Sequence, residues 1–196
     1  MTGALEHLHG HGLVHRDVKP SNVIFVEGVP KLADIGMVAE VSEARSYVGT
    51  EGFIPPEGPG SAQADLYSLG KLLYEISTGK DRHEFPALPP DLDTLPDKPT
   101  LIELNAVLLK ACDPDPRQRH ASAAAMRAEL ELLQQGGSVR RRRVAQHRVA
   151  LARRAALVLG GLALLGVLGF LLLSAMKPPG SGTVANAPDP VSIFVL

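Results

Sequence analysis

Apolar positions along residues 1–138 recur mostly at the three- and four-residue spacing of amphipathic helices. Leu5 and Leu8 indicate a first helix that ends at the glycines of positions 10 and 12. The same periodicity predicts further helices over 64–78, 100–111 and 121–133. The apolar face of the helix over 64–78, which stops at a glycine, holds Leu66, Leu69, Leu73 and Ile76.

Two short apolar runs, 23–26 and 29–33, are separated by Glu27 and Gly28. Acidic or amide residues followed by glycine favour a tight turn between two strands, so this region predicts a β-hairpin. Residues 86–99 contain five prolines and predict an irregular loop. Together these patterns predict a mainly α fold with one short hairpin.

Residues 155–176 form an apolar run of 22 residues without a single charge. At about 1.5 Å per residue, a helix of this length spans roughly 33 Å, enough to cross a hydrocarbon layer of about 30 Å. A buried helix of a soluble protein is the alternative, but such helices are rarely this long without a polar face. The run lies too far along the chain to be a signal peptide. We therefore expect one transmembrane helix here.

The net charge of −1 hides a strong segregation of charges along the chain. Residues 1–138 hold 12 Lys and Arg against 20 Asp and Glu, whereas residues 139–154 hold seven Arg and no acid. Lys177 is the only basic residue that follows the apolar run. The positive-inside rule then places the N-terminal region in the cytoplasm and the C-terminus outside. A solvated linker or a nucleic-acid patch are alternatives for the arginines, but their position beside the apolar run favours a membrane flank and no nucleic-acid partner.

These boundaries predict four segments. They are a globular domain over 1–135, a basic juxtamembrane linker over 136–154, a transmembrane helix over 155–176, and a Pro/Gly-rich extracytoplasmic segment over 177–196. A single cysteine, Cys112, excludes a disulfide framework or a multi-cysteine zinc site, and we expect it to be a small core residue. Small residues at spacing four, Ala152, Ala156 and Gly160, give a weak indication of self-association.

Candidate chemistry is concentrated in the run His15–Asn22, HRDVKPSN, and in Asp34 of ADIG twelve residues later. These motifs resemble the catalytic loop and the metal-binding motif of eukaryotic-type Ser/Thr protein kinases. A lone His-Arg-Asp carries little information. The resemblance rests on the Asp-to-Asn spacing of five, the intervening Lys-Pro, the hairpin and the second aspartate together. The membrane span adds a likeness to bacterial transmembrane kinases of this family.

The resemblance implies the large, C-terminal lobe of a kinase and a role for each motif residue. Asp17 would orient the acceptor hydroxyl and accept its proton, and Lys19 would contact the γ-phosphate of ATP and mark a Ser/Thr preference. Asn22 and Asp34 would hold two Mg²⁺ ions, which prefer oxygen ligands. The hairpin lies between these two residues, so both can reach one cleft. Taken singly, Asp17 could equally cap a loop and Asn22 could be a turn residue.

Further motifs extend the resemblance along residues 2–135. Asp34 to Glu57 would form the activation segment, with Thr50 near Asp17, and Glu57 would pair with Arg119 of DPDPRQRHAS. The structural and regulatory residues also include Asp65 of DLYSLG, which would bond the catalytic-loop backbone.

Neighbouring residues have implied roles as well. Arg16 would clamp a phosphorylated activation segment, and His15 would pack beneath the metal motif. The available phosphate acceptors in that segment are Ser42, Ser46 and Thr50. A metal site built from the histidines at positions 7, 9, 11 and 15 is an alternative, but on a helix only the first and third of them share a face.

Departures from the family pattern are also visible. Ile35 stands where the family has the Phe of DFG, and Pro55 where it has the Ala of APE. No Gly-rich loop and no strand lysine precede His15, so we expect a partial kinase domain without its N-terminal lobe. The leading hypothesis is a membrane-anchored Ser/Thr protein kinase, truncated in that lobe, that transfers the γ-phosphate of ATP to Ser or Thr of proteins. The alternative is a catalytically inactive, membrane-tethered scaffold or binding module.

Overall fold

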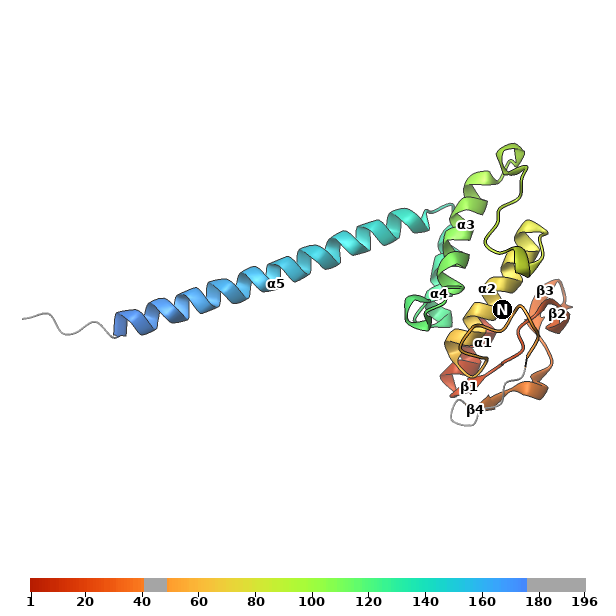
Figure 1. Cartoon of the computed structure of the whole chain (residues 1–196), viewed down its shortest axis with the longest axis horizontal. Coiled ribbons are helices and arrows are strands. Elements are labelled where there is room, and N and C mark those ends of the chain that lie inside the picture. Colours follow the sequence, from red (N-terminus) through yellow and green to blue (C-terminus); the bar gives the residue numbers. More distant parts are fainter. Residues whose placement is uncertain (41–48, 176–196) are drawn as a thin grey trace, which may run out of the picture. The chain divides into compact units, whose positions relative to one another are not determined.

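The computed structural model describes residues 1–40 and 49–175 and divides the chain into two compact units, Met1–Ala145 and Gln146–Leu196 (Figure 1). The first unit is mainly α, as the apolar pattern predicts. Its longer helices are α1 (Thr2–Gly10), α2 (Ala62–Thr78), α3 (Lys98–Ala111) and α4 (Ala123–Gln134). Local interactions define both ends of α2. At its start the Ser61 side chain accepts a hydrogen bond from the Ala64 amide, and at its end Gly79 adopts the left-handed conformation.

Helix α2 is the centre of the core. It packs against α3, and α1 packs against α4. The core cluster takes members from all four helices, including Leu5, Leu69, Val107 and Met126. The apolar spacing of α2 does not match its burial throughout: Ile76 is 63% exposed, whereas Leu72 and Tyr74 are fully buried. The apolar stripe of the sequence therefore continues into the last turn of α2 although the core does not.

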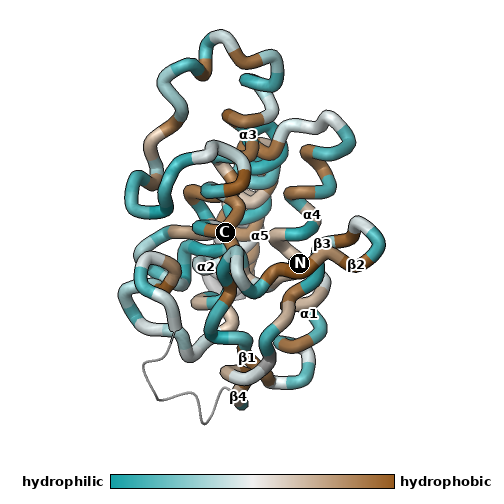
Figure 2. Tube along the Cα trace, turned by 90° about the vertical axis from the view of Figure 1, so that its right-hand side faces the viewer, coloured by the Kyte–Doolittle hydropathy of each residue, from teal (hydrophilic) through white to brown (hydrophobic). Residues whose placement is uncertain are grey.

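The predicted hairpin is confirmed. Strand β2 (Val23–Val26) pairs antiparallel with β3 (Val29–Leu32), and Glu27 and Gly28 both have positive φ at the turn. A second ribbon, β1 (Leu13–Val14) with β4 (Ala39–Glu40), was not predicted, because two-residue strands are too short to show an alternating pattern. The β2–β3 hairpin exposes apolar side chains at Ile24, Phe25, Val26 and Val29. In Figure 2 the tube at this hairpin carries the brown colour of hydrophobic residues.

The loop predicted over 86–99 is irregular up to residue 97, apart from the 3₁₀ turn Leu92–Thr94, and its last two residues are the first two of α3. The irregular region begins earlier than predicted, at residue 79, and includes a second 3₁₀ turn, Arg82–Glu84. Cys112, which follows α3, is buried as expected, and burial raises the pKa of its thiol to about 12. It is therefore a protonated, inert core residue at neutral pH.

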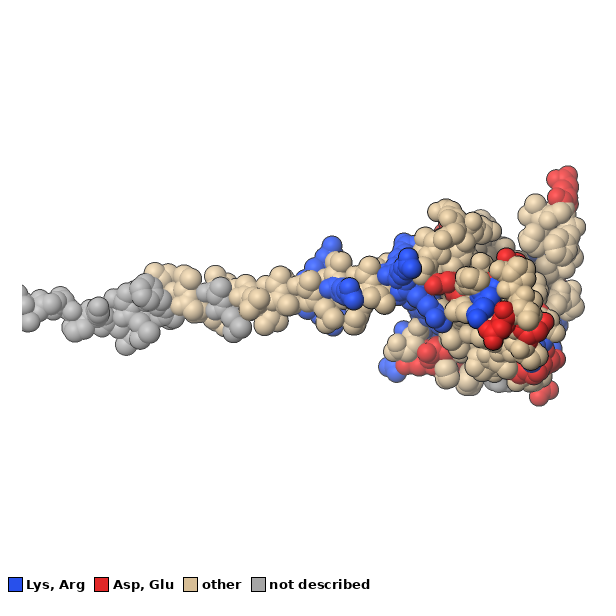
Figure 3. Space-filling model, turned by 90° about the horizontal axis from the view of Figure 1, so that it is seen from above, with Lys and Arg blue, Asp and Glu red and all other residues tan. Residues whose placement is uncertain are grey.

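Helix α5 runs from Val139 to Ala175, so the segment expected as a basic linker is helical from Val139 onward. Its arginines lie along the first part of the helix, before the apolar stretch (Figure 3). Within the described residues, Val139–Leu168 is long and apolar enough to cross a membrane, and none of its most apolar window is buried. The expected segment 177–196 lies outside the described residues.

The first residues of α5 belong to the first unit and are joined to its helices by polar contacts. Arg143 donates to both carboxylate oxygens of Glu129, at 3.0 and 2.5 Å, and to the carbonyl of Ala106 at 2.9 Å. His120 Nε2 lies 2.8 Å from Glu129 Oε2, one of the two oxygens that Arg143 also contacts. Burial alone would raise the pKa of Glu129, but the hydrogen bonds from His120 and Arg143 outweigh it and lower that pKa to about 2.

We expect the Glu129→Gln variant to lose stability at neutral pH and not in acid. Because the folded-state pKa of Glu129 is lowered from 4.5 to about 2, its stabilising contribution is complete above pH 4.5 and disappears as the pH falls toward 2. Urea unfolding at pH 7 should show a loss on the order of 1–2 kcal/mol after solvent screening. The matched control is Glu131→Gln, an exposed carboxylate on α4. An equal loss at pH 7 and pH 2 would contradict the assignment.

Candidate active site

The loop that follows β1 is held in place by one buried carboxylate of α2. Asp65, which is 1% exposed, accepts the backbone amides of His15 and Arg16, both at 2.8 Å. Arg16 adopts a left-handed conformation with φ of 71°, which a non-glycine residue keeps only when its surroundings enforce it. The structure thus brings together three residues that the sequence singled out.

His9 contributes to the same carboxylate and was not predicted to do so. Its Nε2 lies 2.9 Å from Asp65 Oδ2. The sequence gives no signal for this contact, because it joins residues 56 positions apart. The structure gives no support to the alternative metal site, because among the described residues no group of three or more His, Cys, Asp or Glu could hold a metal ion.

Asp17 is surrounded by donors. Its Oδ1 accepts a hydrogen bond from Thr50 Oγ1 at 2.8 Å, and its Oδ2 accepts one from Asn22 Nδ2 at 3.0 Å and lies 2.7 Å from Lys19 Nζ. Burial of Asp17, which is 4% exposed, tends to raise its pKa, but Lys19, Thr50 and Asn22 together hold that pKa below the usual 3.8. Asp17 is therefore an ionised hydrogen-bond acceptor at neutral pH.

Lys19 and Thr50 complete this arrangement. Lys19 Nζ donates to Thr50 Oγ1 at 2.8 Å, and the same hydroxyl donates to Asp17. Thr50 belongs to the segment expected to face the catalytic loop, and it reaches that loop from 31 residues away. The other expected phosphate acceptors, Ser42 and Ser46, lie outside the described residues, as does the side chain of Ile35.

Asn22 directly precedes the first strand of the hairpin and Asp34 follows the second, so both lie at its open end. The Ala33 amide donates to the Asn22 carbonyl at 2.8 Å, which places Asp34 one residue beyond this link. The Nδ2 group of Asn22 donates to Asp17, so its amide oxygen is the atom that could face a cation. Asp34 is exposed, has φ of 59°, and accepts the Gly36 amide at 3.3 Å. An amide oxygen and an exposed carboxylate are ligands that fit Mg²⁺.

His15 also contacts the end of this hairpin. Its buried ring places Nε2 3.2 Å from the Ala33 carbonyl, directly before Asp34. The side chain therefore connects the loop that carries Asp17 with the strand that leads to Asp34.

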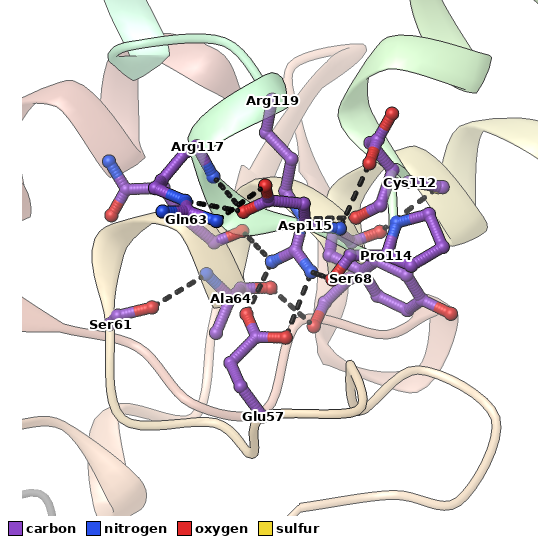
Figure 4. Close-up of polar contacts among 12 residues, drawn as sticks. Glu57, Ser61, Gln63, Ala64, Ser68, Cys112, Pro114, Asp115, Arg117 and Arg119 are labelled. Carbon is purple, nitrogen blue, oxygen red and sulfur yellow. Dashed lines mark hydrogen bonds and ion pairs between the residues drawn. The ribbon is translucent and has the colours of Figure 1, made fainter.

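Glu57 and Arg119 form a bidentate ion pair (Figure 4). Arg119 Nη1 and Nη2 donate to the two carboxylate oxygens at 2.5 and 2.9 Å, and the arginine side chain is fully buried. The guanidinium also donates to the carbonyls of Asp113 and Gln63. This pair ties the segment ahead of α2 to the turn between α3 and α4.

Comparison with known proteins indicates the class of protein. Residues 1–88 match the protein kinase domain family. Similar curated proteins include the serine/threonine-protein kinase PknB of Mycolicibacterium smegmatis, which is 34% identical over an alignment that covers 68% of this chain and 25% of that protein. The serine/threonine-protein kinase PknG of Mycobacterium leprae is 34% identical over 65% of this chain and 17% of its own length. The DNA damage-responsive kinase RqkA of Deinococcus radiodurans is 31% identical over 62% and 22%.

The match over residues 1–88 and the names of these relatives support a eukaryotic-type Ser/Thr protein kinase. The chain spans about a quarter of the length of PknB and a smaller share of the other two relatives.

We expect Arg119→Lys to destabilise the first unit, because a lysine keeps the charge but cannot form the paired bonds to Glu57. Loss of these charge-assisted bonds should reduce the free energy of unfolding by about 2–4 kcal/mol in urea titrations. Arg117→Lys is the matched control, since Arg117 is on the same turn, pairs with Asp115 and has an 87% exposed side chain. Equal stability of the two variants would mean that the buried pair contributes nothing.

Proposed function

We propose that the protein is a membrane-anchored Ser/Thr protein kinase that transfers the γ-phosphate of ATP to serine or threonine hydroxyls of proteins. The observation that carries this proposal is the hydrogen bond that the Thr50 hydroxyl donates to Asp17. The oxygen of this hydroxyl also accepts a hydrogen bond from Lys19. A hydroxyl already occupies the position in which an acceptor hydroxyl would have to bind. The family and the names of the relatives support the same reaction class.

The geometry supports a proposed role for each residue in this reaction. Asp17 accepts the hydrogen bond of the acceptor hydroxyl and takes its proton as the oxygen bonds to the γ-phosphorus and ADP leaves. The ammonium of Lys19, 2.7 Å from Asp17, balances negative charge on the phosphoryl oxygens. Asn22 and Asp34 would hold Mg²⁺, which supplies charge neutralisation of the phosphates.

Membrane anchoring is the second part of the proposal. The length and composition of Val139–Leu168 support it, as do the arginines that precede the apolar run. The positive-inside rule then places residues 1–135 in the cytoplasm and the C-terminal segment outside.

A kinase-like binding module on the same anchor is the second candidate. The exposed apolar side chains of the β2–β3 hairpin favour it, because exposed apolar patches commonly serve as binding surfaces. The two candidates differ in what they require of Asp17, which only the kinase needs as a proton acceptor.

We expect Asp17→Asn to abolish phosphotransfer and to leave nucleotide binding nearly unchanged. Removal of a general base should lower the rate about 100-fold or more. The full-length protein in lipid nanodiscs would be incubated with labelled ATP, Mg²⁺ and a Ser/Thr peptide library, and nucleotide affinity would be measured in parallel. Asp115→Asn, a change in the turn between α3 and α4, is the control and should retain full activity. Wild-type protein that binds ATP without any transfer would favour the binding module.

We expect the protein to resist extraction from membranes by alkaline carbonate. The double substitution Leu164→Arg and Leu168→Arg should release the protein from the membrane, because each charge near the centre of a span costs about 2.5–3.5 kcal/mol. Leu151→Arg places the same charge in the basic segment and should leave the protein membrane-bound. Complete extraction of the wild type by carbonate would contradict an integral anchor.

A further inference from the structure

Arg82, in the 3₁₀ turn that follows α2, contacts the segment that carries Thr50. Its Nε donates to the Glu51 carbonyl at 3.0 Å, and its guanidinium carbon lies 4.7 Å from the centre of the Phe53 ring. Glu75 of α2 fixes the guanidinium from the other side, because its Oε1 accepts both Nη1 and the backbone amide of Arg82 at 3.1 Å. Arg82 therefore connects the end of α2 to residues 51–53.

Lys71 holds the backbone of Arg82. It is 8% exposed, and its Nζ donates to the Arg82 carbonyl at 2.8 Å and lies 4.7 Å from the centre of the Phe85 ring. Burial lowers the pKa of Lys71, as expected for a lysine within a helix otherwise rich in leucine. Burying a lysine is unfavourable unless its ammonium is hydrogen-bonded. Here the hydrogen bond of Lys71 fixes the loop that carries Arg82.

Gly52 permits the close approach of the guanidinium. It has φ of 82°, and a Cβ there would lie 2.5 Å from Arg82 Nε. Ser68 of α2 adds a further bond to this segment, since its Oγ donates to the Phe53 carbonyl at 2.8 Å. Residues 51–53 are thus fixed to α2 both directly and through Arg82.

These residues are continuous with the hydroxyl that binds Asp17. The Phe53 amide donates to the Thr50 carbonyl at 3.1 Å, which closes a turn around Glu51 and Gly52. The same segment lines a cavity of about 330 Å³ together with Gly49 and Ile54. A shift of the Glu51 carbonyl would therefore move both Thr50 and the wall of this cavity.

We infer that Arg82 is a positioning residue for the protein acceptor: it sets residues 50–53 at the distance from Asp17 that an acceptor hydroxyl requires. Lys71 and Glu75 act through Arg82. This inference rests on the proposed function and names a determinant of acceptor binding at the same site. Within the described part of the chain, Arg82 makes no hydrogen bond or ion pair with Asp17, Asn22 or Asp34, so its effect should be confined to the acceptor.

The test compares Arg82→Ala with Lys80→Ala in the full-length protein. Lys80 pairs with Glu84 at 2.6 Å in the same loop and, in the described residues, makes no hydrogen bond to residues 50–53, so it is a matched control. Arg82→Ala should raise the KM for an acceptor peptide about tenfold, the effect of losing one charge-assisted bond, with the KM for ATP unchanged. Lys80→Ala should change neither. Equal KM values for acceptor peptide in both variants would overturn the inference.

Amide hydrogen exchange provides a readout that does not need activity. Arg82→Ala should speed exchange at Phe53 and its neighbours, while Leu66, Leu69 and Leu72 stay protected as in the wild type. Faster exchange across α2 as well would show a general structural role and overturn the inference. If the wild type transfers no phosphate, the proposed function fails, and the exchange at Phe53 alone decides whether Arg82 positions the segment.

Discussion

The carboxylate of Asp65 is the contact on which the candidate site depends most directly. It is buried inside the first unit, accepts two successive backbone amides of the loop before Asp17, and is itself bonded by His9. Buried amides without partners would each cost about 1–3 kcal/mol, and the left-handed conformation of Arg16 would add to that cost. The position of Asp17 is therefore fixed from α2, a helix that begins 45 residues later and contributes none of the residues proposed for the chemistry.

The same helix supports the acceptor side of the site. Asp65, Ser68 and Glu75 are separated by three and seven residues, so they lie along one side of α2. Asp65 holds the loop that carries Asp17, Ser68 holds the Phe53 carbonyl, and Glu75 holds Arg82 against Glu51. A rigid helix thus sets both the loop that carries Asp17 and the segment that carries Thr50. Their separation is then determined by one element rather than by the flexibility of two loops.

The sequence predicts what local patterns encode and misses what long-range contacts decide. Helical periodicity and the Glu27-Gly28 turn are local signals, and the helices and the hairpin are confirmed. Ile76 has the right spacing for the core but is exposed, because burial depends on neighbours that periodicity does not contain. The proximity of Asp17, Asn22 and Thr50 followed only from resemblance to a family. The contact of Arg82 with Glu51 had no such guide, because it joins residues that are distant along the chain.

The environment of Asp17 bears on the choice between a kinase and a binding module. Burial opposes the ionised form of this carboxyl, and the chain offsets that with an ammonium, a hydroxyl and an amide aimed at its two oxygens. A binding module has no need for an ionised acceptor at this depth, since an apolar or neutral side chain would be less costly to bury. Phosphotransfer does need one, because the acceptor hydroxyl must be oriented and deprotonated there. The three donors around Asp17 therefore favour the proposed kinase over the proposed binding module.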